Sequence, residues 1–263
     1  MKMELQKKLE KNEIKSSVPC RVDFGGTLDI STFYLPLNRF SPSSFNIALD
    51  LRTYVTLSSY KSGWIKISSK GFESAEFKSN LAPYNHPMGL MFAIADYFNA
   101  QGVHIQIEST SPPRSAMGGS SSAAVAMAAA FFYANGLSVN PGQTAWLGHY
   151  IESSVAGIPC GMQDQLAAAF GGVNQWFWRM ENGTPSFTQK SLVKNDGDIE
   201  AFNDNILVAY CGIPHVSKDI NNRWVTSFIN GDVRKNFERI AIITEEFSSA
   251  VQDKKYSLAK DLM

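Results

Sequence analysis

The sequence predicts an α+β protein, because strand-like and helix-like segments are mixed along the chain. Residues 45–58 and 64–68 are rich in β-branched and apolar residues and flank the turn Lys61-Ser62-Gly63, which predicts a hairpin. Residues 88–99 carry apolar residues at helical spacing, and residues 103–107 alternate as a half-buried strand does.

Length and composition exclude several classes of protein. The chain has 263 residues, 44% of them hydrophobic, so it can bury the core of one large or two small domains. Lys and Arg total 24, as do Asp and Glu, and a net charge of zero argues against nucleic acid as the main partner. The longest apolar stretch, residues 123–134, is far shorter than the roughly 20 residues of a membrane span, so we expect no membrane role.

The cysteines and the N-terminal residues indicate the cellular location of the protein. Cys20, Cys160 and Cys211 are far apart and form no CxxC motif, which indicates neither a disulfide framework nor a zinc cluster. Residues 1–16 mix Lys with Glu around no apolar core, so they predict a solvated helix or tail and no signal or transit peptide. We therefore expect a cytoplasmic protein.

The first elements lead into a glycine turn. Residues 18–24 predict a short strand that ends at Gly25-Gly26-Thr27, and the loop that follows carries Asp29. Further along, two prolines end the strand before Gly118-Gly119, after which residues 123–134 are alanine-rich on every face. A helix with small apolar residues on all sides is expected to be buried and closely packed.

Two more helices and a second region follow. Asn140-Pro141 predicts a helix start, with Asn as the N-cap, for a helix that runs to about residue 155, and a third helix spans residues 161–170. We then expect a strand at 175–178, a polar linker at 181–198, a strand at 206–210 and helical structure from 224 onward. The predicted organisation is a charged leader (1–16), an N-terminal domain (17–190) and a C-terminal domain (191–263).

Gly118-Gly119-Ser120-Ser121-Ser122 is a candidate anion site. Backbone N–H groups and the positive end of a helix dipole converge there, and a serine hydroxyl can bind a phosphate oxygen or its Mg²⁺. The alternative is that the serines only cap the helix. The chain has neither GxxxxGK[ST] nor GxGxxG, so the loop is not of the Walker or dinucleotide type.

Two carboxylates flank the next tight turn. Glu152 lies near the end of one helix and Asp164 in the first turn of the next. A carboxylate at a helix N-terminus is kept ionised by the dipole, so Asp164 is suited to accept a proton or hold a cation. The alternative is that Asp164 only stabilises its helix and Glu152 is solvated.

Three segments together resemble the motifs of the GHMP kinase superfamily, which includes galactokinases, homoserine kinases, mevalonate kinases and heptose kinases. Residues 19–29 (PCRVDFGGTLD) are similar to the N-terminal substrate motif, and residues 113–122 resemble the phosphate loop PxGxGLGSS. Glu152 with residues 157–165 (GIPCGMQDQ) resembles the third block. The order and spacing of the three are more specific than each motif alone.

The resemblance implies a role for each matching residue. Asp164 would be the catalytic base and Arg21 its partner, while Ser120 and Glu152 would hold Mg²⁺. The substrate would contact Asp29, Gly26, Gly161 and Gln163. The nucleotide would contact Pro113, Arg114, Ser115, Ala116, Met117, Gly118, Gly119, Ser120, Ser121 and Ser122.

The resemblance also implies a two-domain fold, with an N-terminal domain like domain 2 of ribosomal protein S5 and a ferredoxin-like C-terminal domain. Arg114 and Ala116 stand where the family loop prefers glycine, and the late GAGGGG-type motif is absent from the sequence. We therefore expect the C-terminal domain to be incomplete, as in a fragment of a longer protein or a degenerate member.

The implied activity is transfer of the γ-phosphoryl group of ATP to a sugar hydroxyl, with Mg²⁺. The segment QDQLAAAFGG (163–172) is more similar to sugar kinases of the heptose type than to mevalonate or homoserine kinases, and the anomeric hydroxyl is one candidate acceptor. Two alternatives stay open: a kinase of a non-sugar alcohol, and a catalytically silent protein that binds sugar or nucleotide. The expected partners are sugar and ATP, and a homodimer is one assembly that the sequence leaves open.

Overall fold

The computed structural model describes residues 2–113, 115–157, 159–213 and 217–263. These residues form one mixed seven-stranded sheet with the order β4-β3-β5-β2-β6-β7, and β1 pairs with β2. The strands are β1 (Ile14–Gly25), β2 (Ser43–Ser59), β3 (Trp64–Ser69), β4 (Ala75–Lys78), β5 (Val103–Ser109), β6 (Val173–Glu181) and β7 (Thr184–Val193).

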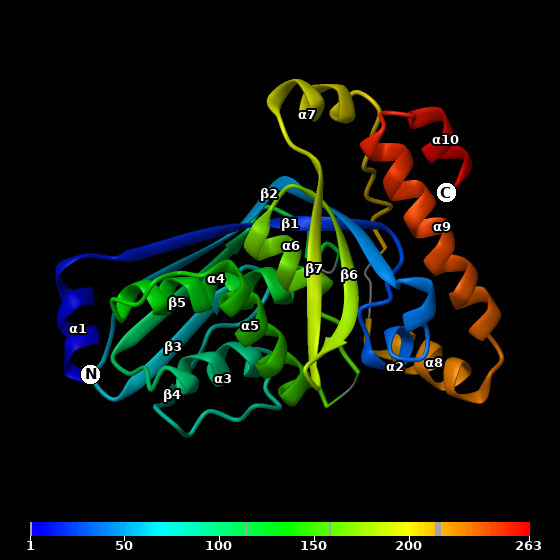
Figure 1. Ribbon diagram of the computed structural model, residues 1–263. Coiled ribbons are helices and arrows are strands. Elements are labelled where there is room, and N and C mark those ends of the chain that lie inside the picture. The colour runs from blue at the N-terminus through cyan, green and yellow to red at the C-terminus, as the bar shows by residue number, and fades with distance from the viewer. Residues whose placement is uncertain (1, 114, 158, 214–216) are drawn as a thin grey trace.

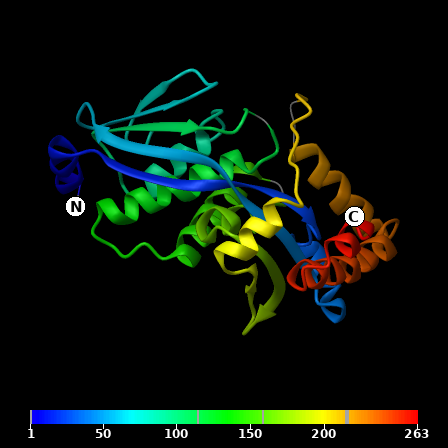
Figure 2. The same ribbon diagram turned by 90° about the horizontal axis from the view of Figure 1, so that it is seen from above.

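Strand β2 organises the sheet because it is long enough to serve several partners. Its first half pairs antiparallel with β6 and its second half antiparallel with β5, while β1 runs antiparallel beside most of its length. The long strands β1 and β2 therefore run side by side along the sheet (Figure 2), and β2 joins β5 to β6.

Helices cover the sheet and close one end of the molecule (Figure 1). Helices α4 and α6 pack against β1 and β2, α5 packs on both of these helices, and α9 contacts β2 and β7. The helices are α1 (Lys2–Lys11), α2 (Ser31–Tyr34), α3 (Gly89–Tyr97), α4 (Gly119–Ala134), α5 (Pro141–Ala156), α6 (Gln163–Phe170), α7 (Asp196–Asn203), α8 (Ser217–Asn230), α9 (Arg234–Gln252) and α10 (Tyr256–Asp261), with a 3₁₀ turn at Asn38–Phe40.

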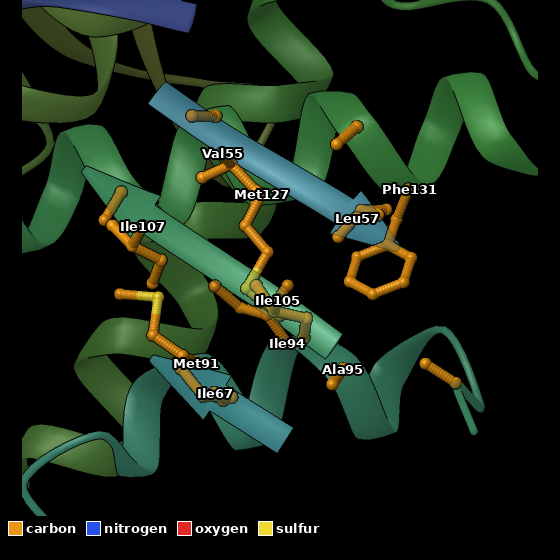
Figure 3. Close-up of a cluster of buried hydrophobic side chains, with 14 of the residues drawn as sticks. Val55, Leu57, Ile67, Met91, Ile94, Ala95, Ile105, Ile107, Met127 and Phe131 are labelled. Atoms are coloured by element: carbon orange, nitrogen blue, oxygen red, sulfur yellow. The ribbon is translucent and has the colours of Figure 1, made fainter. Parts of the chain in front are cut away.

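The largest hydrophobic cluster lies between the sheet and helices α3 and α4 (Figure 3). Val55, Ile67 and Ile105 from three strands meet Met127 and Phe131 of α4. Alanines on every face of α4 let neighbouring helices and strands approach closely, so the helix is buried as its sequence predicts. This burial fixes the position of its N-terminus.

Most predicted elements are confirmed. The α+β class is correct, and the strands at 18–24 and 103–107 and the helices at 88–99, 123–134 and 161–170 all occur, with boundaries shifted by a few residues. Asn140 caps α5 as predicted, since its side chain accepts a hydrogen bond from the N–H of Gln143 at 3.0 Å.

The predicted hairpin of residues 45–58 and 64–68 is wrong, because β5 lies between its two strands. β3 pairs in parallel with β5, and β2 pairs antiparallel with β5. The alternating apolar residues of β5, such as Ile105, fill the centre of the core, which explains why this strand takes the inner position.

The region after residue 180 differs further from expectation. The predicted linker at 181–198 contains β7 and the start of α7, and the predicted strand at 206–210 has no regular structure. Although its apolar composition predicts a strand, this segment lies at the surface, since Leu207 is 89% exposed. Strand β7 is polar because it lies at the sheet edge, where one strand partner suffices.

The charged leader forms a helix, but it is not solvated on all sides. Leu5 and Leu9 of α1 are almost fully buried in the main cluster, one turn apart on the same face. Lys8 between them donates a hydrogen bond to the carbonyl of Ala134 at the end of α4. In the part of the chain that the structure describes, no helix is long and apolar enough to cross a membrane.

Candidate functional site

The three motifs meet at the N-terminus of α4. Arg21 on β1 reaches across to Asp164 in the first turn of α6, and Glu152 near the end of α5 reaches Ser120 in the first turn of α4. Packing of α4, α5 and α6 on one another holds these positions together. Residues that are more than a hundred positions apart in the sequence thus form one site.

Arg21 and Asp164 form a two-pronged ion pair. The guanidinium Nε donates to Oδ1 and Nη2 to Oδ2 of Asp164, both at 2.8 Å. Arg21 also contacts Asp23, with 3.0 Å between Nε and Oδ2. Burial alone would lower the pKa of Arg21, but Asp164 and Asp23 raise it overall, so the guanidinium stays charged.

Asp23 is the acidic residue that the sequence analysis missed. It shares Arg21 with Asp164, and its Oδ1 is buried without a hydrogen-bond partner in the described residues. Burial raises the pKa of Asp23 from 3.8 to about 8, although Arg21 opposes this shift. The sequence did offer a signal for a role of Asp23, since this residue lies within the motif at residues 19–29, two positions from Arg21.

The loop before α4 adopts a left-handed backbone at two positions. Ala116 has φ +61° and Gly118 has φ +69°, both in the left-handed region that favours glycine. The carbonyl of Ala116 accepts a hydrogen bond from Nη1 of Arg21, and that of Met117 from the N–H of Arg21. The loop is therefore held against the ion pair.

The hydroxyls after the loop divide into two groups. Ser120 is exposed, and its Oγ donates to Oε1 of Glu152 at 2.9 Å. Ser121 is buried and donates to Oε2 of Glu152 at 2.8 Å. Ser122 is buried as well, and its Oγ donates to the carbonyl of Gly119 and contacts Thr53. Ser120 is thus the hydroxyl of the three that is open to a ligand.

Glu152 is a buried carboxylate surrounded by donors. Gln165 Nε2 also donates to its Oε2, at 2.6 Å, which adds a residue that the sequence analysis did not assign. Burial raises the pKa of Glu152, while the hydrogen bonds from Ser121 and Ser120 oppose this. A cation beside this carboxylate would offset the cost of burying its charge.

These donors fit Mg²⁺ only together with phosphate oxygens. Mg²⁺ in nucleotide sites takes one or two carboxylates and completes its shell with phosphates and water. Among the described residues, no group of three or more His, Cys, Asp or Glu side chains could hold a metal alone. The oxygens of Ser120 and Glu152 therefore suit a metal that arrives with a nucleotide.

The candidate substrate residues form a second centre beside the first. Oδ2 of Asp29 accepts a hydrogen bond from the N–H of Gln163 at 3.0 Å, and the carboxyl occupies the space above Gly161, where a Cβ would lie 1.6 Å from Oδ2. Burial raises the pKa of Asp29 to about 6, although the Gln163 N–H opposes the shift. Gly26 has φ +88°, and a Cβ there would meet the Ser43 carbonyl at 2.1 Å.

The remaining predicted nucleotide residues lie around the loop. Pro113, Ala116 and Gly119 are exposed, Ser115 is half-buried and Met117 is buried. Arg114 and Ile158, which lie in the second and third motifs, fall outside the described residues.

A hollow of about 100 Å³ opens beside Asp29. Its walls are largely aromatic, from α2, α5, β6 and β7, and His149 and Cys160 lie in it as well. Tyr34, Trp146, Tyr150, Trp178 and Phe187 supply the rings. A mostly apolar hollow with a few polar groups beside reactive side chains is the usual form of a small-molecule site.

The resemblance to GHMP kinases that the three motifs predict is confirmed. Residues 85–172 match a family model described as GHMP kinases N terminal domain. The chain is similar to the D-glycero-alpha-D-manno-heptose 7-phosphate kinase of Campylobacter jejuni, with 27% identity over 218 residues. That match covers 79% of this chain and 62% of the relative, so the chain spans less than two thirds of that relative's length.

Solved structures confirm the fold. A D-glycero-D-manno-heptose 1-phosphate kinase from Bacteroides thetaiotaomicron has 22% identity and a TM-score of 0.59, covering 86% of this chain and 76% of its own. The galactokinase of Lactococcus lactis, solved with galactose, has 13% identity and a TM-score of 0.65, covering 96% of this chain and 73% of its own. The fold of this chain is therefore that of the GHMP kinases.

Proposed function

We propose that this protein is an ATP-dependent kinase that transfers the γ-phosphoryl group to a sugar hydroxyl. The observation that carries the proposal is that the Arg21–Asp164 ion pair lies beside Gly118, the residue that precedes α4. A Cβ on Gly118 would lie 3.5 Å from Arg21 Nε and 3.5 Å from Asp164 Oδ2. The proposed base, Asp164, thus lies close to the loop that would bind the phosphates.

Asp164 accepts the proton in this proposal. As the sugar oxygen bonds to the γ-phosphorus, its proton passes to Asp164, the bond from phosphorus to the bridging oxygen breaks, and ADP leaves. Arg21 orients the carboxylate through its two hydrogen bonds and keeps a positive charge beside the developing negative charge. Most of the acceleration then comes from position and charge.

The start of α4 binds the phosphates. Gly119 and Ser120 are exposed, and the N–H groups of the first helical turn point out of the helix together with its positive dipole end. Ser120 and Glu152 would hold Mg²⁺, which would neutralise charge on the phosphates. A donor other than ATP would also fit this cradle, so ATP is assigned from the resemblance to GHMP kinases.

A sugar acceptor is favoured by the hollow beside Asp29 and by the named relatives. Heptose phosphate kinases and a galactokinase are among the proteins to which this chain is similar. Asp29 would bind sugar hydroxyls, with the N–H of Gln163 holding it in place. The anomeric hydroxyl remains one candidate acceptor, and a cytoplasmic location remains our prediction.

The base is tested by Asp164→Asn. The change keeps the shape of the side chain but removes the proton acceptor, so we expect kcat to fall at least ~10²-fold. ADP release over a panel of sugars measures this, and nucleotide affinity should change little. Asp232→Asn, at an exposed acid remote from the motifs, is the matched control. Full activity of Asp164→Asn would remove this residue from the mechanism.

The same panel separates the two alternatives. Turnover with a non-sugar alcohol and none with sugars would indicate a different acceptor on the same scaffold. Binding of sugar or nucleotide without any ADP release would indicate a silent binding protein. The hydrogen-bonded carboxylates of Asp164 and Glu152 favour an enzyme, because a binding protein has no need of a base.

A further inference from the structure

The aromatic hollow continues outward into a wider one. The outer hollow is about 520 Å³ and shares Trp146, Tyr150 and Phe187 with the inner one. It adds Glu181, Asn182 and Thr184 at the turn between β6 and β7. A substrate that touches Asp29 at the inner end would therefore extend toward this turn.

The charged side chains that line this path are acidic in the part of the chain that the structure describes. Among the described residues that line the two hollows, Asp29 and Glu181 are the charged ones, and neither Lys nor Arg is present. The guanidinium of Arg21 is engaged by Asp164 and Asp23, and Arg21 is not among the described residues that line the hollows. Arg179 on the outer side is paired with Glu181 at 3.5 Å.

A phosphate group would therefore bind poorly along this path. Proteins recognise phosphate with Arg, Lys or several N–H donors, and a dianion taken out of water without them is strongly unfavourable. The Asp29 carboxylate would add repulsion, whereas the charge of Glu181 is offset by Arg179.

His149 supplies an acceptor at the inner end. Its Nδ1 lies 3.0 Å from the carbonyl oxygen of Gly161, and because a carbonyl only accepts, Nδ1 carries the proton. Burial lowers the pKa of His149, although the Gly161 carbonyl opposes the shift. The ring is thus neutral near pH 7, and Nε2 has a lone pair that accepts from a hydroxyl. Asp29 accepts as well, so the polar groups here match hydroxyl donors.

The rings suit the apolar face of a sugar. Trp146 and Tyr150 are stacked with centroids 5.2 Å apart, and Trp146 lies 6.1 Å from Phe187. Such a wall buries the C–H face of a pyranose, while its hydroxyls point to the acceptors.

We propose that this hollow binds an unphosphorylated sugar and that His149 is a residue that determines specificity for it. The proposal rests on the proposed function and names its substrate class. It separates this chain from the relative named for a heptose 7-phosphate. The charge of the lining, rather than overall similarity, decides between the two substrate classes.

The first experiment is equilibrium binding to the unmodified protein by calorimetry. D-Galactose, D-mannose and D-glycero-D-manno-heptose are each compared with the terminal phosphate ester of the same sugar. We expect at least one free sugar to bind at least ~10-fold more tightly than its phosphate. Equal or tighter binding of the phosphate, or binding of neither, overturns the proposal. Binding is read without turnover, so loss of ADP release with intact binding contradicts only the kinase function.

The second experiment changes His149. His149→Asn can still donate to Gly161 but lacks the acceptor at Nε2, so the KM or Kd of the free sugar should rise about 10-fold. The KM for ATP should change less than about twofold, whereas a purely structural effect would weaken both ligands. His104→Asn is the matched control, since His104 is half-buried and hydrogen-bonded to Ser68 outside the site. An unchanged sugar constant in His149→Asn removes His149 from the proposal.

Discussion

At the scale of single residues, the site depends on one cation shared by two acids. Arg21 binds both Asp164 and Asp23, and all three side chains are largely buried. Asp164 has both oxygens engaged, whereas Asp23 keeps one oxygen without a partner among the described residues. Arg21 is therefore held mainly by Asp164, while burial raises the pKa of Asp23 to about 8.

This arrangement predicts a pH dependence of stability. The pKa of Asp23 is raised from 3.8 to about 8 by burial, so between these pH values the folded protein binds more protons than the unfolded chain. The free energy of unfolding should therefore fall as the pH rises through this window, and Asp29, with a pKa raised to about 6, contributes in its lower part.

The variant Asp23→Asn tests this, because its amide does not titrate. It should lose less stability than the unchanged protein between pH 5 and pH 8, measured by urea unfolding at each pH. Parallel pH profiles of the two proteins would show that Asp23 is ionised throughout and that Arg21 compensates its burial.

Glu152 gives a separate prediction. If it holds Mg²⁺ with Ser120, Glu152→Gln should raise the Mg²⁺ concentration needed for half-maximal activity and lower kcat. The hydrogen bonds from Ser120 and Ser121 can still be accepted by the amide oxygen, so the fold should be kept. A Mg²⁺ titration of this variant beside Glu246→Gln, an exposed acid on α9, measures the effect. Identical titration curves would mean that Glu152 is only a structural acceptor.

The candidate site was largely predictable at this scale. Arg21, Asp164, Ser120 and Glu152 were all named from motifs, and they do lie together. Asp23 and Gln165 were not, because their roles come from burial and from contacts with residues far away in sequence. His149 gave no signal either, since its ring acts through Gly161 in a different motif.

At the scale of elements, the two glycines at the start of α4, Gly118 and Gly119, have different roles. Gly118 has φ +69°, and a Cβ there would meet Arg21 Cγ at 3.4 Å, whereas a Cβ on Gly119 meets nothing within 4 Å. Gly118 is thus required by the backbone and by the ion pair. Gly119 is required only if a ligand approaches its open side.

The matched variants Gly118→Ala and Gly119→Ala test this difference. Gly118→Ala should lower the free energy of unfolding by ~1–2 kcal/mol, the cost of a left-handed backbone for alanine. Gly119→Ala should leave stability unchanged or slightly higher, since alanine favours helix, yet weaken nucleotide binding. Urea unfolding and nucleotide titration measure the two effects. Unchanged nucleotide affinity in Gly119→Ala would move the phosphate away from this turn.

The elements that sequence patterns predicted are those with a strong period. Residues 88–99 and 103–107 show clear helical and strand spacing and form α3 and β5. Pairing was not predictable from neighbours in sequence, since β5 enters between β2 and β3. Composition alone predicted a linker where the polar edge strand β7 lies, and a strand at the segment that contains the exposed Leu207.

At the scale of the whole molecule, the predicted domains 17–190 and 191–263 share hydrophobic clusters. In one cluster, Phe33 of α2 packs on Phe228 and Phe237 from α8 and α9, with ring centroids 5.3 and 4.6 Å away. In another, Phe45 of β2 packs on Phe247 of α9 at 4.8 Å. Neither region can lose its fold without exposing apolar surface of the other.

The two regions should therefore unfold in one cooperative transition rather than two. Phe237→Ala removes a buried ring between them and should cost about 3–5 kcal/mol, which lowers the midpoint of the whole transition. Calorimetry, together with far-ultraviolet circular dichroism and tryptophan fluorescence, follows both regions, and Ile229→Ala, at a side chain that is 58% exposed, is the control. Trp176 and Trp178 of β6 report on residues 17–190, and Trp224 of α8 reports on residues 191–263. If Phe237→Ala instead splits the transition and shifts only one part, the regions are independent domains, and the shared clusters contribute little to cooperativity.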